Sequence, residues 1–371
     1  MCGMTEKGLT LSGTFVYGDD FEEKDGYIVI ENGTIKEIGD GNVEAALKGI
    51  IIPSFVNAHT HIGDSIAKEP DFMPLDKLVG PGGFKHKVLD ETPYDVLVSA
   101  MKDTIEDIFV SGTQMFADFR EGGVSGAIAL HEAFSSARGE DKLSVRLFGR
   151  TQEGPEELNT LLHSVDGIGV SSVANHKQDD LALLAEEAKK SGKKFAIHAG
   201  ERNADDIEAA IELEPDFIVH LTKATPHDFR KMRDKNIGAV VCVRSNLVTG
   251  MGLPPLRQML ESGLTVGVGT DNVMLNSPNM FSEMEFIAKI FRLDEKDVLK
   301  LCTRNSATVL TEEGNIGTIE VGKPANLVVI RTDTPNMSNV MNPLKGVVRR
   351  ATRNDIAAIV YNGAIQCRFV P

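Results

Sequence analysis

Two histidines separated by one residue, His59 and His61, form the clearest chemical pattern in this 371-residue sequence. On an extended chain, residues i and i+2 point to the same side, so both imidazoles can reach one metal ion. Further groups able to bind a metal or move a proton lie at or just after the ends of other apolar runs: His198, Glu201, His220 and Asp271. A third imidazole and a carboxylate would complete a site rich in nitrogen and oxygen, which suits Zn²⁺ or Fe²⁺.

A metal held in this way favours hydrolytic chemistry. An open position on the ion binds water and lowers the pKa of that water toward about 7, which makes hydroxide available at neutral pH. Taken singly, the residues have simpler interpretations. His220 could be a hydrogen-bonded core residue, and Asp271, close to Gly269, could be a helix cap or turn residue. Their common position at the ends of apolar runs favours the metal site.

The apolar runs that carry these residues alternate with helical patterns, which predicts a (β/α)8 TIM barrel. The expected strands are residues 50–57, 113–119, 145–149, 167–171, 194–198, 217–220, 239–243 and 265–269. Active sites of such barrels lie at the C-terminal ends of the strands, where the histidines and acids listed above fall. The other histidines lie on expected loops or helices and are interpreted as solvated or structural: His86, His131, His163, His176 and His227.

Both ends of the chain carry strand-like patterns, whereas the middle alternates between strand-like and helical patterns. Short strand-like runs are joined by Asn32-Gly33 near the start and by Asn362-Gly363 near the end, and both pairs are typical of tight hairpin turns. We therefore expect a small β-sandwich domain built from residues 1–50 plus 312–371. The metal-binding catalytic barrel is expected to occupy residues 51–311.

The composition excludes several other classes of function. A net charge of −15 and a sequence pI of about 5.1 argue against binding to nucleic acid or to anionic membranes, which need basic surfaces. The four cysteines form no C-x-x-C, so the Pro-Cys-x-x-Cys zinc site of cytidine-deaminase-type enzymes is absent from the sequence. No apolar run approaches the ~20 residues of a membrane span, and no secretory leader is visible. We expect a cytoplasmic protein and leave homo-oligomerisation open.

Five segments resemble motifs of the amidohydrolase superfamily, in its mononuclear deaminase and chlorohydrolase branch near the cytosine, guanine and adenosylhomocysteine deaminases. The segment 53–61 is similar to Pro-Gly-Phe-x-Asn-x-His-x-His, and 198–201 to His-x-x-Glu. Segments 242–246 and 269–271 resemble Cys-Pro-x-Ser-Asn and Gly-Thr-Asp, and 317–329 resembles the closing Gly-x-Ile-x-x-Gly-x-x-Ala-Asp-Leu-Val. The motifs occur in this order over nearly the whole chain.

The resemblance implies a role for each site residue. The metal ligands would be His59, His61, His198 and Asp271. Asp271 would also accept a proton from the attacking water, Glu201 would shuttle that proton, and His220 would orient the hydroxide or stabilise the developing oxyanion. The fourth expected strand has no lysine to bridge a second ion, so one divalent ion is expected. Zinc is favoured, with iron and manganese as alternatives.

The expected reaction is deamination of an amino-substituted heterocycle, such as a purine, pyrimidine, pterin or adenosine derivative. Metal-bound hydroxide would attack the ring and ammonia would leave. His-x-x-Glu favours this chemistry because the ring nitrogen must be protonated as water adds. Cyclic-amide hydrolysis or dechlorination at the same site is the alternative, and a non-catalytic binding protein is a remote one. Arg120, Arg150 and Asn272 are the expected substrate contacts, because guanidinium groups match oxo or anionic edges.

Overall fold

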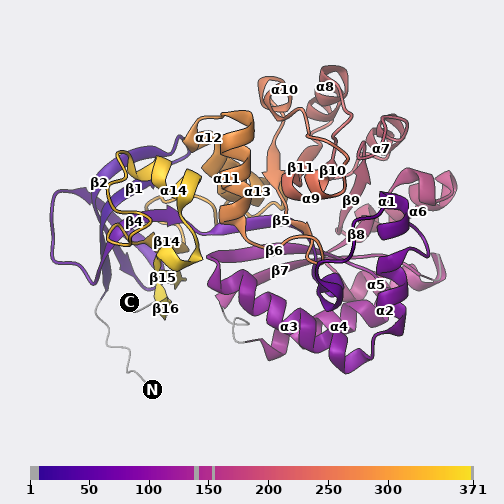
Figure 1. Cartoon of the computed structure of the whole chain (residues 1–371), viewed down its shortest axis with the longest axis horizontal. Coiled ribbons are helices and arrows are strands. Elements are labelled where there is room, and N and C mark those ends of the chain that lie inside the picture. Colours follow the sequence, from indigo (N-terminus) through magenta and orange to yellow (C-terminus); the bar gives the residue numbers. More distant parts are fainter. Residues whose placement is uncertain (1–7, 138–141, 153–154, 369–371) are drawn as a thin grey trace. The chain divides into compact units, whose positions relative to one another are not determined.

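The computed structural model describes residues 8–137, 142–152 and 155–368, and it divides into two compact units (Figure 1). One unit comprises Met1–Val56, Phe109–Gln114 and Met280–Pro371, and the other comprises Asn57–Ile108 and Met115–Asn279. Residues 1–7 and 369–371 of the expected terminal domain lie outside the described residues. The domain boundaries of 1–50 plus 312–371 and of 51–311 stay predictions.

The second unit is organised by a curled sheet that fits the predicted TIM barrel. Its order in the described part of the chain is β12-β11-β10-β9-β8-β7-β6-β5-β13. The strands are β5 (Phe55–His61), β6 (Thr113–Arg120), β7 (Ser144–Gly149), β8 (Gly167–Val170), β9 (Lys194–Ala199), β10 (Phe217–His220), β11 (Gly238–Val241), β12 (Val266–Val268) and β13 (Asp271–Asn272). From β6 to β12 neighbouring strands are parallel, and β13, two residues after β12, pairs parallel with β5. The last strand therefore lies beside the first.

Helices follow the strands along the chain, as the alternating pattern predicts. They are η1 (Ile62–Ala67), α1 (Leu75–Leu78), α2 (Phe84–Glu91), α3 (Tyr94–Val110), α4 (Gly123–Ser136), α5 (Pro155–Ser164), η3 (Val173–Asn175), α6 (Gln178–Lys190), α7 (Ile207–Glu212), α8 (Pro226–Asp234), α9 (Val243–Val248) and α10 (Leu256–Glu261). Helix α4 packs against β7, and α6 packs against β8 and β9 (Figure 1). Helix α8 begins where Thr225 and Asp228 form a capping box with Pro226 in the first turn, which is a helix start that the sequence indicates.

Seven of the eight expected barrel strands lie within two residues of their predicted positions, because strands covered on both faces read as continuous apolar runs. The expectation of one strand over residues 50–57 is wrong. The chain forms β4 (Leu47–Pro53) in the terminal sheet and then β5 in the barrel. Ser54 separates them: its amide donates to Asn326 O, whereas the next amide, of Phe55, donates to Gly112 O. In the sequence, the apolar residues on both sides of Ser54 read as one run, so the change of partner strand is not visible there.

The first unit contains one seven-stranded sheet built from both chain ends, in the order β16-β15-β14-β4-β1-β2-β3 within the described residues. Its other strands are β1 (Leu9–Tyr17), β2 (Glu22–Glu31), β3 (Thr34–Asp40), β14 (Leu327–Ile330), β15 (Ile356–Tyr361) and β16 (Ala364–Arg368). Both predicted hairpin turns are confirmed, because Asn32-Gly33 joins β2 to β3 and Asn362-Gly363 joins β15 to β16 with positive φ throughout. The two-layered β-sandwich is not confirmed.

A glycine at residue 13 lets two strands of this sheet approach closely. Gly13 of β1 has φ +135° and pairs with Gly49 of β4, and a Cβ at Gly13 would lie 2.0 Å from Gly49 O. A buried apolar core includes Phe15, Ile51 and Leu327.

The remaining helices of this unit are α11 (Met280–Phe291), α12 (Glu295–Lys300), η4 (Leu301–Asn305), α13 (Ser306–Val309), α14 (Pro343–Arg350) and η5 (Arg353–Asp355). Along the described ranges, no helix combines the length and apolar character needed to cross a membrane.

Candidate metal centre and active site

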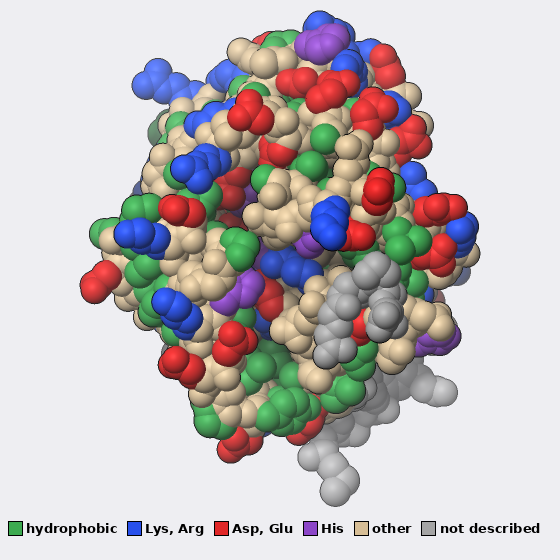
Figure 2. All heavy atoms as spheres, turned by 90° about the vertical axis from the view of Figure 1, so that its right-hand side faces the viewer, with side chains coloured by type: hydrophobic (Ala, Val, Ile, Leu, Met, Phe, Trp, Pro, Cys, Tyr) green, Lys and Arg blue, Asp and Glu red, His purple; other side chains and the backbone are tan. Residues whose placement is uncertain are grey.

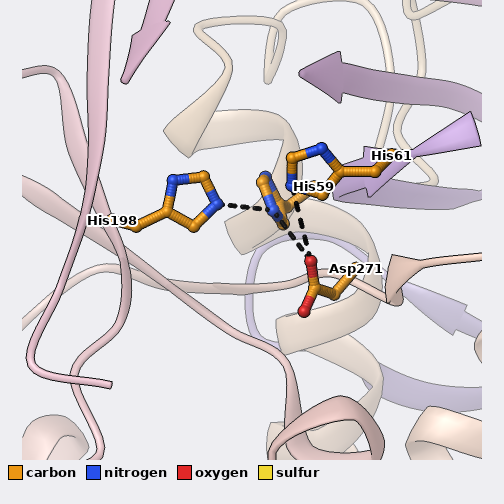
Figure 3. Close-up of side chains that lie close together, drawn as sticks. All are labelled: His59, His61, His198 and Asp271. Carbon is orange, nitrogen blue, oxygen red and sulfur yellow. Dashed lines mark hydrogen bonds and ion pairs between the residues drawn. The ribbon is translucent and has the colours of Figure 1, made fainter. Parts of the chain in front are cut away.

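Three imidazoles and one carboxylate converge at the end of the barrel strands (Figure 3). His59 and His61 lie at the end of β5, His198 near the end of β9, and Asp271 opens β13. Asp271 Oδ1 lies 3.3 Å from His59 Nε2 and 3.6 Å from His61 Nε2, and His198 Nε2 lies 3.1 Å from His59 Nε2. All four side chains are buried, and their ligand atoms lie within 4.8 Å of one another.

Hydrogen bonds behind the cluster decide which ring nitrogen faces it. His61 Nδ1 lies 2.9 Å from Phe119 O, and His198 Nδ1 lies 2.8 Å from Val170 O. A backbone carbonyl only accepts, so each Nδ1 carries the proton and each Nε2 presents a lone pair to the centre of the cluster. Metal-binding histidines are commonly held by such bonds, which fix the tautomer and the ring orientation.

The protonation states of these groups fit a cation. Burial lowers the pKa of His59, His61 and His198, that of His61 to about 3, so the imidazoles are neutral near pH 7. Burial alone would raise the pKa of Asp271, but the neighbouring histidines outweigh it and hold that pKa well below its usual range. Among the described residues, Asp271 Oδ1 has no hydrogen-bond donor. The converging lone pairs of the imidazole nitrogens, together with a buried carboxylate oxygen that accepts no hydrogen bond, suit a divalent ion.

The backbone explains why two separated motifs build one cluster. Asn57 Nδ2 donates to Thr270 Oγ1 at 2.8 Å, and Thr270 N donates to Asn57 Oδ1 at 3.1 Å. These bonds tie β5 to the residue just before Asp271. Gly269 has to be a glycine here, because a Cβ would lie 2.6 Å from His59 Cβ. Asp271 itself has φ +62°, a conformation that non-glycine residues seldom adopt and that clusters at functional sites.

Glu201 and His220 lie next to the cluster. His220 Nε2 is 3.5 Å from Glu201 Oε2, and His220 has φ +78° at the end of β10. Burial raises the pKa of Glu201, against the influence of His220. A carboxyl group with a raised pKa is suited to both taking up and releasing a proton.

Two residues of α9 also contact this group. Ser245 Oγ donates to Asp271 Oδ2 at 2.5 Å, and Asn246 Nδ2 lies 3.1 Å from His220 Nδ1 and 3.3 Å from Glu201 Oε1. Neither residue is among the site residues expected from the sequence. Their place in the segment 242–246, which resembles a family motif, is the signal that could have found them.

A cavity of about 430 Å³ opens onto the cluster. His61, His198, Glu201, His220 and Asp271 line it. Figure 2 looks onto this side of the molecule and shows a hollow with histidine and charged side chains within it. One wall comes from the segment after β5, through residues of α1, α2 and the loop between them. The group that could hold a metal is thus open to a small molecule.

Of the expected substrate contacts, Arg150 and Asn272 line the cavity and Arg120 does not. The guanidinium of Arg120 is buried, with Nη2 2.7 Å from Glu121 Oε2 and Nη1 3.8 Å from Asp118 Oδ2. The side chain of Arg150 has no hydrogen bond or ion pair to any described residue. Arg120 therefore serves internal contacts, whereas Arg150 is available to a ligand.

The cavity contains three basic groups that the sequence did not indicate, Lys85, His86 and Arg202. Lys85 is buried on α2, and its Nζ lies 2.7 Å from Glu121 Oε1 and 3.1 Å from Asn272 Oδ1. Glu121 in turn lies 3.0 Å from His61 Nδ1, so Lys85 and His61 share one carboxylate. His86 also lines the cavity, although the sequence suggested a solvated or structural role. Among the described lining residues there is no Phe or Tyr, so only histidines offer an aromatic face.

Comparison with known proteins shows to which family this chain belongs. The model of the amidohydrolase family matches residues 50–365. An uncharacterized protein of Methanocaldococcus jannaschii is 36% identical over 94% of this chain and 96% of its own. A 5-methylthioadenosine/S-adenosylhomocysteine deaminase of Caldanaerobacter subterraneus is 25% identical over 91% of this chain and 87% of its own.

The solved structures agree on the fold. The zinc complex of atrazine chlorohydrolase from Arthrobacter aurescens superposes with a TM-score of 0.80 at 18% identity, covering 96% of this chain and 94% of the other. At that identity the likeness concerns the fold alone. Together with the family match over most of the sequence, these findings show that the chain belongs to the amidohydrolase family and is a hydrolase acting on carbon–nitrogen bonds.

Proposed function

We propose that this protein hydrolytically removes the amino group of a heterocycle, a purine, pyrimidine, pterin or adenosine derivative, and releases ammonia. The observation that carries the proposal is the placement of Glu201 and His220 beside the His–Asp cluster in one cavity. The deaminase named among the relatives gives independent support. Deamination needs a group that delivers a proton to the ring and to the leaving amine, and Glu201 is placed to do so.

His59, His61, His198 and Asp271 would hold one divalent ion. Zinc is favoured by three imidazole nitrogens and one carboxylate oxygen, with iron and manganese as alternatives. When bound, such an ion lowers the pKa of water and supplies a nucleophile near neutral pH.

The remaining steps belong to the chain's own residues. Asp271 accepts a proton from the attacking water, and Glu201 passes this proton to the ring nitrogen. His220 donates a hydrogen bond to the oxygen that becomes negatively charged at the attacked carbon. Glu201 then takes the second proton of the water from the hydroxyl group now bonded to the attacked carbon and delivers it to the amine as the carbon–nitrogen bond breaks, so that water and the amino compound become the oxo compound and ammonia.

Ammonia release is the direct test of this proposal. Metal-loaded protein should release ammonia from at least one member of a panel of aminopurines, aminopyrimidines, pterins and adenosine derivatives. If no member reacts, cyclic-amide hydrolysis or dechlorination at the same centre takes its place. Purified protein without stoichiometric metal, and without any gain on reconstitution, would favour a non-catalytic binding protein.

Arg150 is proposed as a substrate contact that recognises an oxo or anionic group. Its guanidinium lines the cavity without a partner among the described residues. Arg150→Ala should raise KM for the true substrate roughly 10-fold or more, because a charged hydrogen bond contributes about 1.5–3 kcal/mol. Steady-state kinetics check this, with Arg202→Ala, another basic residue of the cavity, as the comparison. An unchanged kcat/KM for Arg150→Ala would remove the residue from the site.

The substrate is proposed to be the small-molecule partner, and neither nucleic acid nor membrane is expected as one. A cytoplasmic location remains a prediction from the sequence, which leaves homo-oligomerisation open.

A further inference from the structure

Two adjacent side chains of one short helix contact Asp271, Glu201 and His220. In the proposed mechanism, Asp271 and Glu201 transfer protons and His220 donates a hydrogen bond at the reacting centre. Ser245 and Asn246 lie on α9, which begins directly after β11, and both are fully buried. Ser245 contacts Asp271, and Asn246 contacts Glu201 and His220.

Ser245 fixes the rotation of the Asp271 carboxylate. Its hydroxyl donates to Oδ2 at 2.5 Å, which leaves Oδ1 facing His59 Nε2 and His61 Nε2. A carboxylate without this bond could rotate about its Cβ–Cγ bond, because such torsions are broad. The hydroxyl therefore selects which oxygen is presented to the histidines.

Asn246 fixes the tautomer of His220 and the direction of Glu201. Its two amide hydrogens have two acceptors, His220 Nδ1 at 3.1 Å and Glu201 Oε1 at 3.3 Å. Because Nδ1 accepts, the ring proton of neutral His220 resides on Nε2, which lies 3.5 Å from Glu201 Oε2. The same amide thus sets His220 as a donor at Nε2 and holds the carboxylate beside it.

The backbone carbonyls of both residues are already bonded at the C-terminal end of the helix, since Met251 N donates to Asn246 O and Thr249 N donates to Ser245 O. The side-chain contacts to Asp271, His220 and Glu201 are therefore additional to the backbone bonds of α9. The Oδ1 atom of Asn246 is buried and has no hydrogen-bond donor among the described residues. A buried acceptor that lacks a donor costs stability, which a purely structural residue would avoid. Placement of Glu201 and His220 accounts for that cost.

We propose that Ser245 and Asn246 are positioning residues with separate tasks. Ser245 orients Asp271 for the metal, and Asn246 orients His220 and Glu201 for proton transfer. The assignment of tasks rests on the proposed function, whereas the contacts themselves do not.

The experiment pairs substitutions that keep or remove each hydrogen-bonding group. Ser245→Ala should weaken zinc binding by about 10–100-fold, and Ser245→Thr, which retains the hydroxyl, should restore much of that affinity. Asn246→Leu and the isosteric Asn246→Asp should both lower kcat by about 10–100-fold with zinc content and KM near wild type. Leu247→Ala, on the exposed side of the same helix, is the matched control and should change neither quantity.

A readout independent of turnover is the tautomer of His220. Nitrogen NMR of histidine-labelled protein, with the signal identified by its loss in His220→Gln, should show Nε2–H in the wild type. The Nε2–H signal should weaken in Asn246→Leu. Equal zinc affinity in Ser245→Ala and Ser245→Thr would overturn the role of Ser245. An unchanged His220 tautomer in Asn246→Leu, or full kcat in Asn246→Asp, would overturn that of Asn246.

Failure of the proposed function has a different signature from failure of this inference. If the wild type releases no ammonia from any substrate of the panel, the deamination proposal falls. The zinc affinities and the His220 tautomer still decide the positioning roles in that case.

Discussion

Replacing Glu201 by glutamine is expected to leave the protein folded and metal-loaded and to lower kcat by about 10²–10⁴-fold, the usual contribution of general acid–base catalysis. Glutamine keeps the size of the side chain and can still accept from Asn246 Nδ2, but it cannot carry a proton between water and the ring. Glu201 lies 3.5 Å from His220 and outside the four-residue cluster that could hold a metal. Zinc content should therefore remain at the wild-type value.

Ammonia release and metal analysis on the same preparations check this prediction. Glu208→Gln is the matched control, because Glu208 lies on α7 and pairs with Lys231 on the surface. The control should keep wild-type kcat. Full activity in Glu201→Gln would show that another group moves the proton.

Replacing Asp271 by asparagine is expected to have the other large effect, the loss of both metal and turnover. The change removes the single carboxylate of the cluster and leaves three neutral imidazoles to hold a divalent ion. Breaking a buried charged interaction in this way costs several kcal/mol. A loss of about 4 kcal/mol corresponds to roughly a 1,000-fold weaker affinity.

Asp216→Asn provides the control for Asp271. Asp216 also lies among the barrel strands, but it bonds Lys194 Nζ and Phe195 N at the start of β9 rather than at its end. This variant should retain stoichiometric metal. Wild-type metal content in Asp271→Asn would contradict the proposed ligand set.

Most of the barrel could be predicted from the sequence because its strands are buried on both faces and are separated by amphipathic helices. His59, His61, His198 and Asp271 could be found for a related reason. They lie where apolar runs end, and the C-terminal ends of parallel strands meet at one side of a barrel. The hairpins at Asn32-Gly33 and Asn362-Gly363 could be predicted from local backbone preference alone.

What the sequence could not show depends on contacts between distant segments. The change from β4 to β5 at Ser54 lies inside one apolar run, and only the different partners of the two strands reveal it. Arg120 is the last residue of β6 and Arg150 directly follows β7, yet of these two arginines only Arg120 forms an ion pair with Glu121. Lys85 lines the cavity and bonds Asn272, which lies 187 residues further along the chain.

The central claim is that a metal held by His59, His61, His198 and Asp271 drives release of ammonia from a heterocycle. Its most direct test measures ammonia release by one preparation before chelation, after chelation, and after addition of one equivalent of zinc per chain. Activity on a reactive member of the panel should disappear when the metal is removed and return with a single equivalent of zinc. Activity that persists in demonstrably metal-free protein would contradict the central claim.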